Sequence, residues 1–163
     1  MSRKTIVSSL VGAAVLGLSL PAFAAGSATG NFNVAITLTP KCEVFTTGGA
    51  TTTIADLSLA YTSFQTTDAT GSTNFQVRCT NTLGYSLGLD KASDTDGTNK
   101  LAYTLALTSS AASPGIAPIQ TLSSLTGNGK TGQTYYVHGA IAANQDGTVA
   151  ATTSNPRTLT ISY

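Results

Sequence analysis

The chain has 163 residues, of which 9% are charged and 41% are hydrophobic, and its formal net charge is +1. Such a weakly charged, near-neutral chain offers no electrostatic basis for binding nucleic acid or anionic lipid. Its length suits a single domain with a sizeable core. Thr, Ser, Asn and Gly must supply the polar surface, and a Thr-rich chain without Trp is typical of extracytoplasmic β-domains.

The first 24 residues have the pattern of a secretory signal peptide. Residues 1–5 carry two positive charges, residues 6–20 are apolar, and Ala22 and Ala24 form an A-x-A cleavage motif. We expect cleavage after Ala24, the alternative being a membrane anchor, although no basic stop follows the apolar stretch. The remaining chain keeps six basic and seven acidic residues, so its net charge is near −1.

Residues 31–42, NFNVAITLTPKC, predict an extended strand shortly after this signal. Apolar and polar side chains alternate, which predicts one apolar and one polar face. The TPK stretch contains no Gly or Asn for a tight hairpin turn, and Pro40 favours an extended Thr39. The sequence leaves open whether this strand pairs within its own domain or continues outward. Its apolar face consists of Phe32, Val34, Ile36 and Leu38.

Further strand candidates recur along the chain between turn-rich stretches, without helical periodicity or an internal repeat. Seven or eight short strands in about 140 residues predict a β-sandwich. Residues 109–132 are interrupted by Pro114 and Pro118, but their apolar residues predict that part of this stretch packs. The strand candidates are residues 42–46, 53–62, 73–80, 84–90, 100–108, 133–143 and 157–163.

The two cysteines, Cys42 and Cys79, both follow the signal peptide. An oxidising compartment favours a single disulfide between them. In the chain-entropy model, closing this loop would stabilise the fold by roughly 4 kcal/mol. Two cysteines with one distant histidine make no zinc set, and the chain has no C-x-x-C redox motif.

The sequence contains no motif that points to catalysis or to a cofactor. His138 is the only histidine, and we expect a solvated strand residue beside Tyr136, although composition leaves a Ser–His–Asp set open. The Asp-x-Asp-Gly loop at residues 90–100 fails the EF-hand register, so a polar hairpin loop is favoured over calcium binding. The GNGKTG stretch at residues 127–132 lacks phosphate-loop spacing and predicts a turn. We expect a non-enzyme with no catalytic residue, metal site or cofactor.

Three stretches share a pattern with a known family. They are GNFNVAITLTPKCEV, FQVRCTNTLGYSLGLD, and VHGAIAANQ followed at the end by RTLTISY. A cysteine follows an alternating strand, and a second lies in a V-x-C-T context before an L-x-L-D strand. A G-x-I strand and a final strand closing on an aromatic residue complete the pattern. This pattern resembles the spore coat U family, which includes shaft pilins of archaic chaperone–usher pili. Residues 109–132 depart from it, because they lack the acidic and aromatic segment that the family often has there.

The resemblance implies an all-β, incomplete immunoglobulin-like sandwich that is completed by donor-strand exchange. In that family a periplasmic chaperone fills the gap first, and the N-terminal strand of the next subunit then replaces it. It implies a signal peptide at residues 1–24, a donor-strand extension at 25–40 and a pilin domain at 41–163. It also implies that Cys42 and Cys79 form the family disulfide. The implied donor side chains are Phe32, Val34, Ile36 and Leu38, and the implied chaperone-docking edge carries Leu159, Ile161 and Tyr163.

These features lead to the hypothesis of a structural pilus subunit that polymerises into surface filaments for adhesion and biofilm formation. Its expected partners are identical or related pilins, a periplasmic chaperone and an outer-membrane usher, without nucleic acid or an integral membrane span. We expect export through the periplasm to the cell surface. A shaft subunit is favoured over a tip adhesin, because the chain has one domain and a good donor candidate. A small outer-membrane β-barrel and a monomeric secreted binding or coat protein remain as alternatives.

Overall fold

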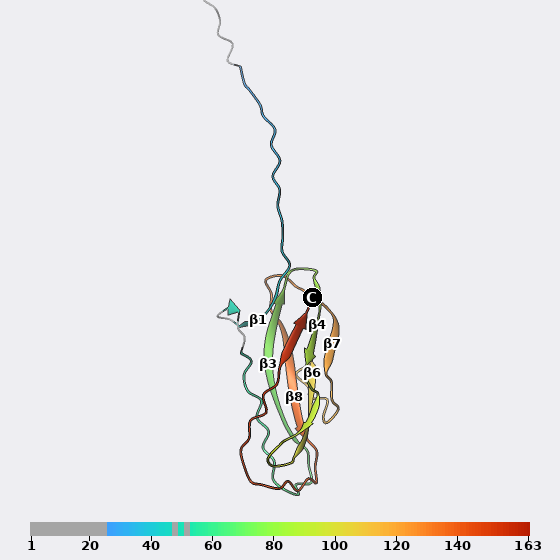
Figure 1. The fold of residues 1–163 in the computed structure, drawn as a ribbon. Coiled ribbons are helices and arrows are strands. Elements are labelled where there is room, and N and C mark those ends of the chain that lie inside the picture. Colours follow the sequence, from blue (N-terminus) through green and yellow to red (C-terminus); the bar gives the residue numbers. More distant parts are fainter. Residues whose placement is uncertain (1–25, 47–48, 51–52) are drawn as a thin grey trace, which may run out of the picture. The chain divides into compact units, whose positions relative to one another are not determined.

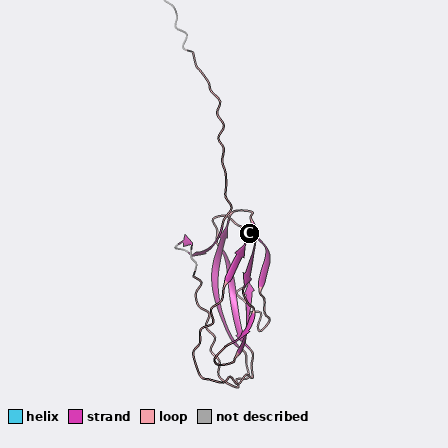
Figure 2. Ribbon diagram, viewed as in Figure 1, coloured by secondary structure: helices cyan, strands magenta, loops and turns pink. Residues whose placement is uncertain are grey.

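The computed structural model describes residues 26–46, 49–50 and 53–163, and these residues contain strands but no helix (Figure 2). The expected signal peptide lies outside the described residues. Within the described ranges, no helix is long and apolar enough to cross a membrane. The strands are β1 (Cys42–Thr46), β2 (Gly49–Ala50), β3 (Ala69–Cys79), β4 (Gly84–Leu89), β5 (Ser93–Thr95), β6 (Ala102–Thr108), β7 (Thr121–Thr126), β8 (Gln133–Ile141) and β9 (Leu159–Ser162).

These strands form two sheets (Figure 1). The larger sheet has the order β2-β1-β3-β8-β6-β5, and the smaller sheet has the order β7-β4-β9. Every ladder between these strands is antiparallel. Because β7 contacts β6, the smaller sheet begins over the β6 side of the larger sheet. Its other end, β9, therefore lies toward the β1 side.

One apolar core joins the two sheets. Period-two alternation points every second side chain of a strand to the same face, and those faces meet between the sheets. Leu87 and Leu107, one from each sheet, are fully buried. This all-β, sandwich-like arrangement agrees with the β-sandwich that the strand pattern predicts. The core residues are Phe75, Val77, Cys79, Tyr85, Leu87, Leu89, Leu105, Leu107, Tyr135 and Val137.

The strand predicted at residues 53–62 is wrong, although its apolar residues do pack. No described residue of this segment belongs to a strand; it crosses the inner face of the larger sheet, where Gly71 and Gly139 pair. A Cβ atom added at Gly71 would lie 2.4 Å from the Ser58 carbonyl oxygen. One added at Gly139 would lie 2.8 Å from a Leu57 methyl carbon. The two glycines thus make room for a chain that covers the sheet without joining a ladder.

The other six predicted strands are confirmed, with ends that shift by a few residues. The prediction that part of residues 109–132 packs is also confirmed, because this stretch contains β7, with Leu122 and Leu125 against the core. Ser124 lies between these leucines with φ at 59°, opposite a register shift in the β4–β7 ladder. This irregularity places two leucines three positions apart on one face, so the strand does not show the period-two alternation by which strands are predicted.

The predicted disulfide is confirmed. Cys42 of β1 and Cys79 of β3 are direct partners in the antiparallel ladder, with Cα atoms 4.1 Å apart, and their Sγ atoms are bonded. Cys79 is buried, and Cys42 packs against the edge of the core. The bond therefore fixes the outer strand β1 to β3 at the start of β1.

Candidate functional site

The apolar residues of the N-terminal segment are exposed. Residues 26–41 belong to no strand, so the strand predicted here has no ladder partner among the residues that the structure describes. Such a row of large apolar side chains in water is an unfavourable arrangement unless another surface covers it. The exposed fractions are 85% for Phe32, 70% for Val34, 88% for Ile36 and 76% for Leu38.

β9 is the last strand of the smaller sheet, and its second edge has no strand neighbour within the described residues. The burial of its inward side chains shows how well the core is covered beside β9. Ile161 pairs with Leu87, and Leu159 pairs with Leu89. The two β4 leucines are buried, whereas both β9 residues are only half-buried although they pack against the same core. The core is therefore incompletely covered beyond β9.

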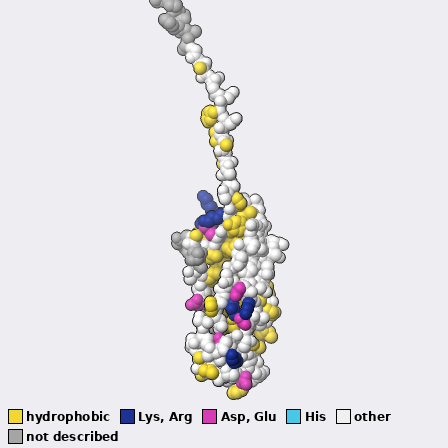
Figure 3. Space-filling view, viewed as in Figure 1, with side chains coloured by type: hydrophobic (Ala, Val, Ile, Leu, Met, Phe, Trp, Pro, Cys, Tyr) yellow, Lys and Arg dark blue, Asp and Glu magenta, His cyan; other side chains and the backbone are white. Residues whose placement is uncertain are grey.

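β1 lies at the corresponding side of the larger sheet. Cys42 and Val44 point toward the core and are half-buried, and only the two-residue strand β2 lies beyond β1. Apolar surface is visible between the positions of β1 and β9 (Figure 3). We call this region, defined by Cys42 and Val44 of β1 and Leu159 and Ile161 of β9, the open edge. An apolar strip between two strand edges has the chemistry required to receive an extended segment.

The outer face of β1 carries paired charges and one aromatic ring, whereas its inner face is apolar. Glu43 pairs with Lys41 at 2.5 Å and accepts a hydrogen bond from Arg78 Nε at 2.9 Å. Hydrogen bonds from these two cations hold the pKa of Glu43 below its usual value. The Arg78 guanidinium also lies 4.2 Å from the centre of the Phe45 ring. These contacts keep charge on the outside of the open edge.

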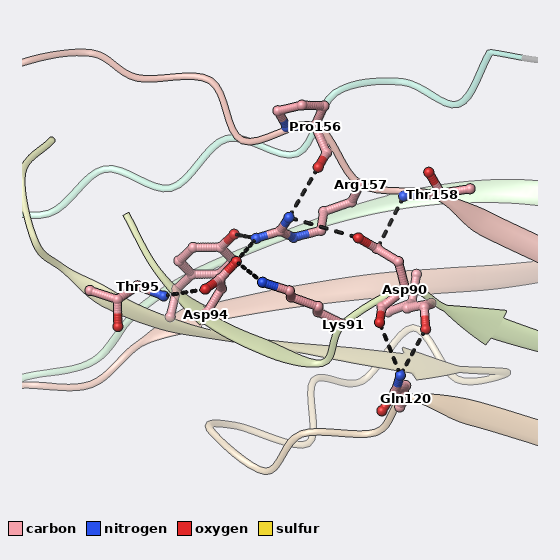
Figure 4. Close-up of polar contacts among 10 residues, drawn as sticks. Asp90, Lys91, Asp94, Thr95, Gln120, Pro156, Arg157 and Thr158 are labelled. Carbon is pink, nitrogen blue, oxygen red and sulfur yellow. Dashed lines mark hydrogen bonds and ion pairs between the residues drawn. The ribbon is translucent and has the colours of Figure 1, made fainter. Parts of the chain in front are cut away.

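Arg157 fixes the chain where it enters β9 (Figure 4). Its guanidinium contacts the Asp94 carboxylate and the Tyr103 hydroxyl, and lies 3.8 Å from the Asp90 carboxylate. Thr158 N donates to Asp90 Oδ1 at 3.1 Å. Hydrogen bonds from Lys91 and from a backbone amide hold the pKa of Asp94 low. This partly buried network sets the position of Leu159 relative to β4.

Asp96 anchors the β5–β6 hairpin loop and the segment that leads to β9. It is 5% exposed, and its Oδ1 accepts hydrogen bonds from the amides of Thr98 and Asn99 at 2.8 and 2.7 Å. Oδ2 accepts a hydrogen bond from the Asn155 amide group at 2.7 Å. Hydrogen bonds from Thr153, Asn155 and these amides hold the pKa of Asp96 far below its usual value. The predicted hairpin is confirmed, and no group of three or more metal-binding side chains occurs among the described residues.

The prediction that His138 is solvated is wrong. The side chain is 2% exposed because the turn after β6 closes over it. Its Nε2 lies 3.0 Å from the Ser110 carbonyl oxygen and 3.1 Å from the Thr108 hydroxyl. Since the carbonyl can only accept, Nε2 donates to it. The predicted neighbour, Tyr136, does stack on the ring at 5.9 Å. These contacts give His138 a structural role in holding the turn.

Sequence reasoning singled out the two cysteines and both inward residues of β9; the structure places Cys79 in the core, and Cys42, Leu159 and Ile161 border that core at the open edge. It places Tyr163 beyond β9, 60% exposed. Sequence reasoning did not find the Arg157 network, because an arginine that pairs with two distant aspartates leaves no local pattern. In comparisons with known proteins, no family model and no curated protein matched this chain.

Proposed function

We propose that this chain is a structural subunit of a surface filament that polymerises by donor-strand complementation. The N-terminal segment of one copy adds as a strand to the open edge of another and completes an immunoglobulin-like sandwich. The observation that carries this proposal is the contrast within one ladder: Leu87 is fully buried, while its partner Ile161 is only half-buried. A further strand beyond β9 would remove that contrast.

The exposed segment has the pattern that such a site requires. In strand addition, main-chain hydrogen bonds supply affinity, and alternate side chains fill apolar positions that set the register. Four alternating apolar residues meet this requirement, and each would contribute about 1.5–3 kcal/mol on full burial before ordering costs. Because the donor and acceptor surfaces differ, the contact does not close on itself and generates a filament.

The same chemistry suggests the partners of an unassembled subunit. An apolar edge without its strand is prone to aggregate, so the subunit needs a protecting partner during export. A periplasmic chaperone that lends a strand to the edge, followed by an outer-membrane usher, would meet this need. The filament on the cell surface would then serve in adhesion.

The test compares two neighbouring substitutions in the segment. Ile36→Asp places a carboxylate in an apolar site. Burying a neutral polar group without a hydrogen bond costs about 2–7 kcal/mol, and burying an unpaired charge costs more. Thr37→Asp places the same carboxylate on the opposite face of the strand. We expect Ile36→Asp to abolish filaments while folded subunits accumulate on the chaperone, and Thr37→Asp to assemble. Filaments at normal yield from Ile36→Asp would contradict the proposal, and so would degradation of this variant despite the chaperone.

A further inference from the structure

Phe64 is a large aromatic residue in a backbone conformation that disfavours it. Its φ is 65°, in the left-handed region that bulky residues rarely adopt, and 71% of its surface is exposed. Strain of this kind costs about 1–3 kcal/mol, and little burial offsets it here. The fold alone would favour Gly or Asn at this position. The exposed ring therefore points to a role outside its own domain.

Hydrogen bonds, rather than the Phe64 side chain, fix this loop. Phe64 N donates to the Gln145 carbonyl at 2.8 Å, and Asn144 N donates to the Gln65 carbonyl at 2.8 Å. The Gln145 side chain in turn accepts a hydrogen bond from Ala102 N at 2.7 Å. Neighbouring loops thus impose the strained conformation, and the phenylalanine ring is held out toward solvent.

This loop lies at the end of the sandwich where β9 begins. Gln145, which holds Phe64, also bonds to β6 through Ala102. Arg157, just before β9, contacts Tyr103, the next residue of β6. We call this end the distal end; it comprises residues 62–68, 96–101 and 142–148.

The opposite, proximal end is where β9 finishes and β1 starts. Ser162 pairs with Ser86 near the start of β4, and Tyr163 follows with 60% exposure. The short loop before β4 leads back to Cys79, whose disulfide partner Cys42 opens β1. The proximal end comprises residues 41–42, 80–83, 127–132 and 163.

The connection between the N-terminal apolar segment and β1 is short and stiff. Three residues lie between Leu38 and Cys42, so four Cα–Cα steps join the two, and these span about 14 Å at most. Pro40 fixes its own φ and keeps Thr39 extended. The domain that follows a bound segment must therefore begin within this reach of the end of the segment.

The direction of strand addition decides at which end of the receiving copy the donor's own domain begins. Every ladder between the described strands is antiparallel, and antiparallel pairing is slightly the more stable. A segment lying antiparallel to β9 of another copy ends where β9 begins, so its Leu38 reaches the distal end of that copy. Its own Cys42, which opens β1 at the proximal end, must then lie close by.

We propose that the distal end of one copy docks on the proximal end of the next, with the Phe64 ring as the anchor of this second contact. The inference rests on the proposed function, because strand addition supplies the second copy. Exposed aromatic rings are typical anchors of protein interfaces. Charge is compatible with this pairing: Asp68, Asp146 and Lys100 are exposed at the distal end, and Lys130 is exposed at the proximal end, where Lys41 is already paired with Glu43.

Photo-cross-linking in filaments of the full chain tests this contact directly. A benzoyl-phenylalanine replaces Phe64, and the same analogue at Asn74, an exposed residue in the middle of β3, serves as the control. We expect position 64 to cross-link to residues 80–83, 127–132 or 163 of a neighbouring copy, and position 74 to give no such product. Filaments in which position 64 reacts only within its own copy would overturn the inference alone. Failure of the unmodified chain to form filaments would contradict the proposed function, and this inference with it.

A second variant separates the contact from the folding of the domain. Phe64→Asn removes the ring and suits the left-handed backbone, so the isolated subunit should be at least as stable as the parent chain. Its filaments should still form through the N-terminal strand but should bend more easily, measured as a shorter persistence length in electron micrographs. Asn74→Ser, in the middle of β3, is the control and should leave the persistence length unchanged. Parental stiffness in the Phe64→Asn filaments would overturn the inference.

Discussion

Moving the N-terminal segment to the end of the chain should complete the fold within one molecule. In this variant, residues 30–39 are removed from the N-terminus and placed after Tyr163 through a short Asn- and Gly-rich turn, which favours a hairpin with β9. The segment can then lie antiparallel to β9 and cover Leu159 and Ile161. We expect a chain that remains monomeric, needs no chaperone and unfolds at a higher temperature than the parent subunit.

The magnitude is best taken from a matched pair of variants of this rearranged chain, since differences are more reliable than absolute sums. Ile36 is 88% exposed in the present structure. Changing it to Asp in the moved segment forfeits about 1.5–3 kcal/mol of burial and adds the cost of a poorly solvated carboxylate, together about 4 kcal/mol. For a domain of this size, that corresponds to roughly 15 °C in Tm. Thr37→Asp faces outward and should change Tm by only about 2 °C.

Thermal unfolding followed by circular dichroism measures both variants, with size-exclusion chromatography to confirm that each is monomeric. Equal Tm values for the Ile36→Asp and Thr37→Asp forms would refute the reasoning, because the segment would then occupy no apolar site. A rearranged chain no more stable than the parent would refute it as well.

Three further predictions concern the domain itself. Replacing both Cys42 and Cys79 with Ala should lower the free energy of unfolding by about 4 kcal/mol in urea titrations, and an unchanged midpoint would contradict the chain-entropy estimate. Gly139→Ala should cost about 1–3 kcal/mol by displacing the segment that crosses the inner face, whereas Gly88→Ala, whose added Cβ meets nothing within 4 Å, should be nearly neutral; equal effects would argue against that crossing. Because hydrogen bonds hold the pKa of Asp96 below its ordinary value of 3.8, its contribution is present above that pH and is lost as the pH falls toward the folded-state pKa. Chemical denaturation between pH 5 and pH 2 should therefore show a steeper loss of stability for the parent chain than for Asp96→Asn, and parallel curves would contradict this assignment.

Alternation predicted those strands that belong to regular ladders, and it failed where tertiary contacts decide the structure. Residues 53–62 alternate as a strand does, but they lie across glycines that come later in the chain, so they have no ladder to join. Around Ser124, a local irregularity breaks the period of a strand that does exist. His138 is buried by a turn some 28 residues away in the sequence, which no local pattern reveals.

The candidate site was predictable to a similar extent. The exposed apolar face and the half-buried residues of β9 follow from period-two reasoning, because alternation assigns each side chain to a face. Which edge of which sheet stays unpaired depends on strand order, which the residues alone do not determine. The strain at Phe64 likewise becomes visible only in the backbone angles.

The position of β9 in the chain also constrains when the open edge can exist. β1 and β3 are complete once residue 79 has been made, so their ladder and the disulfide can form early. β4 must wait for residues 159–162 before its second neighbour arrives, and pairing over such a separation is slow. A nascent or truncated chain without residues 159–162 therefore lacks the edge altogether, so the proposed assembly requires a subunit in which β9 has already been synthesised.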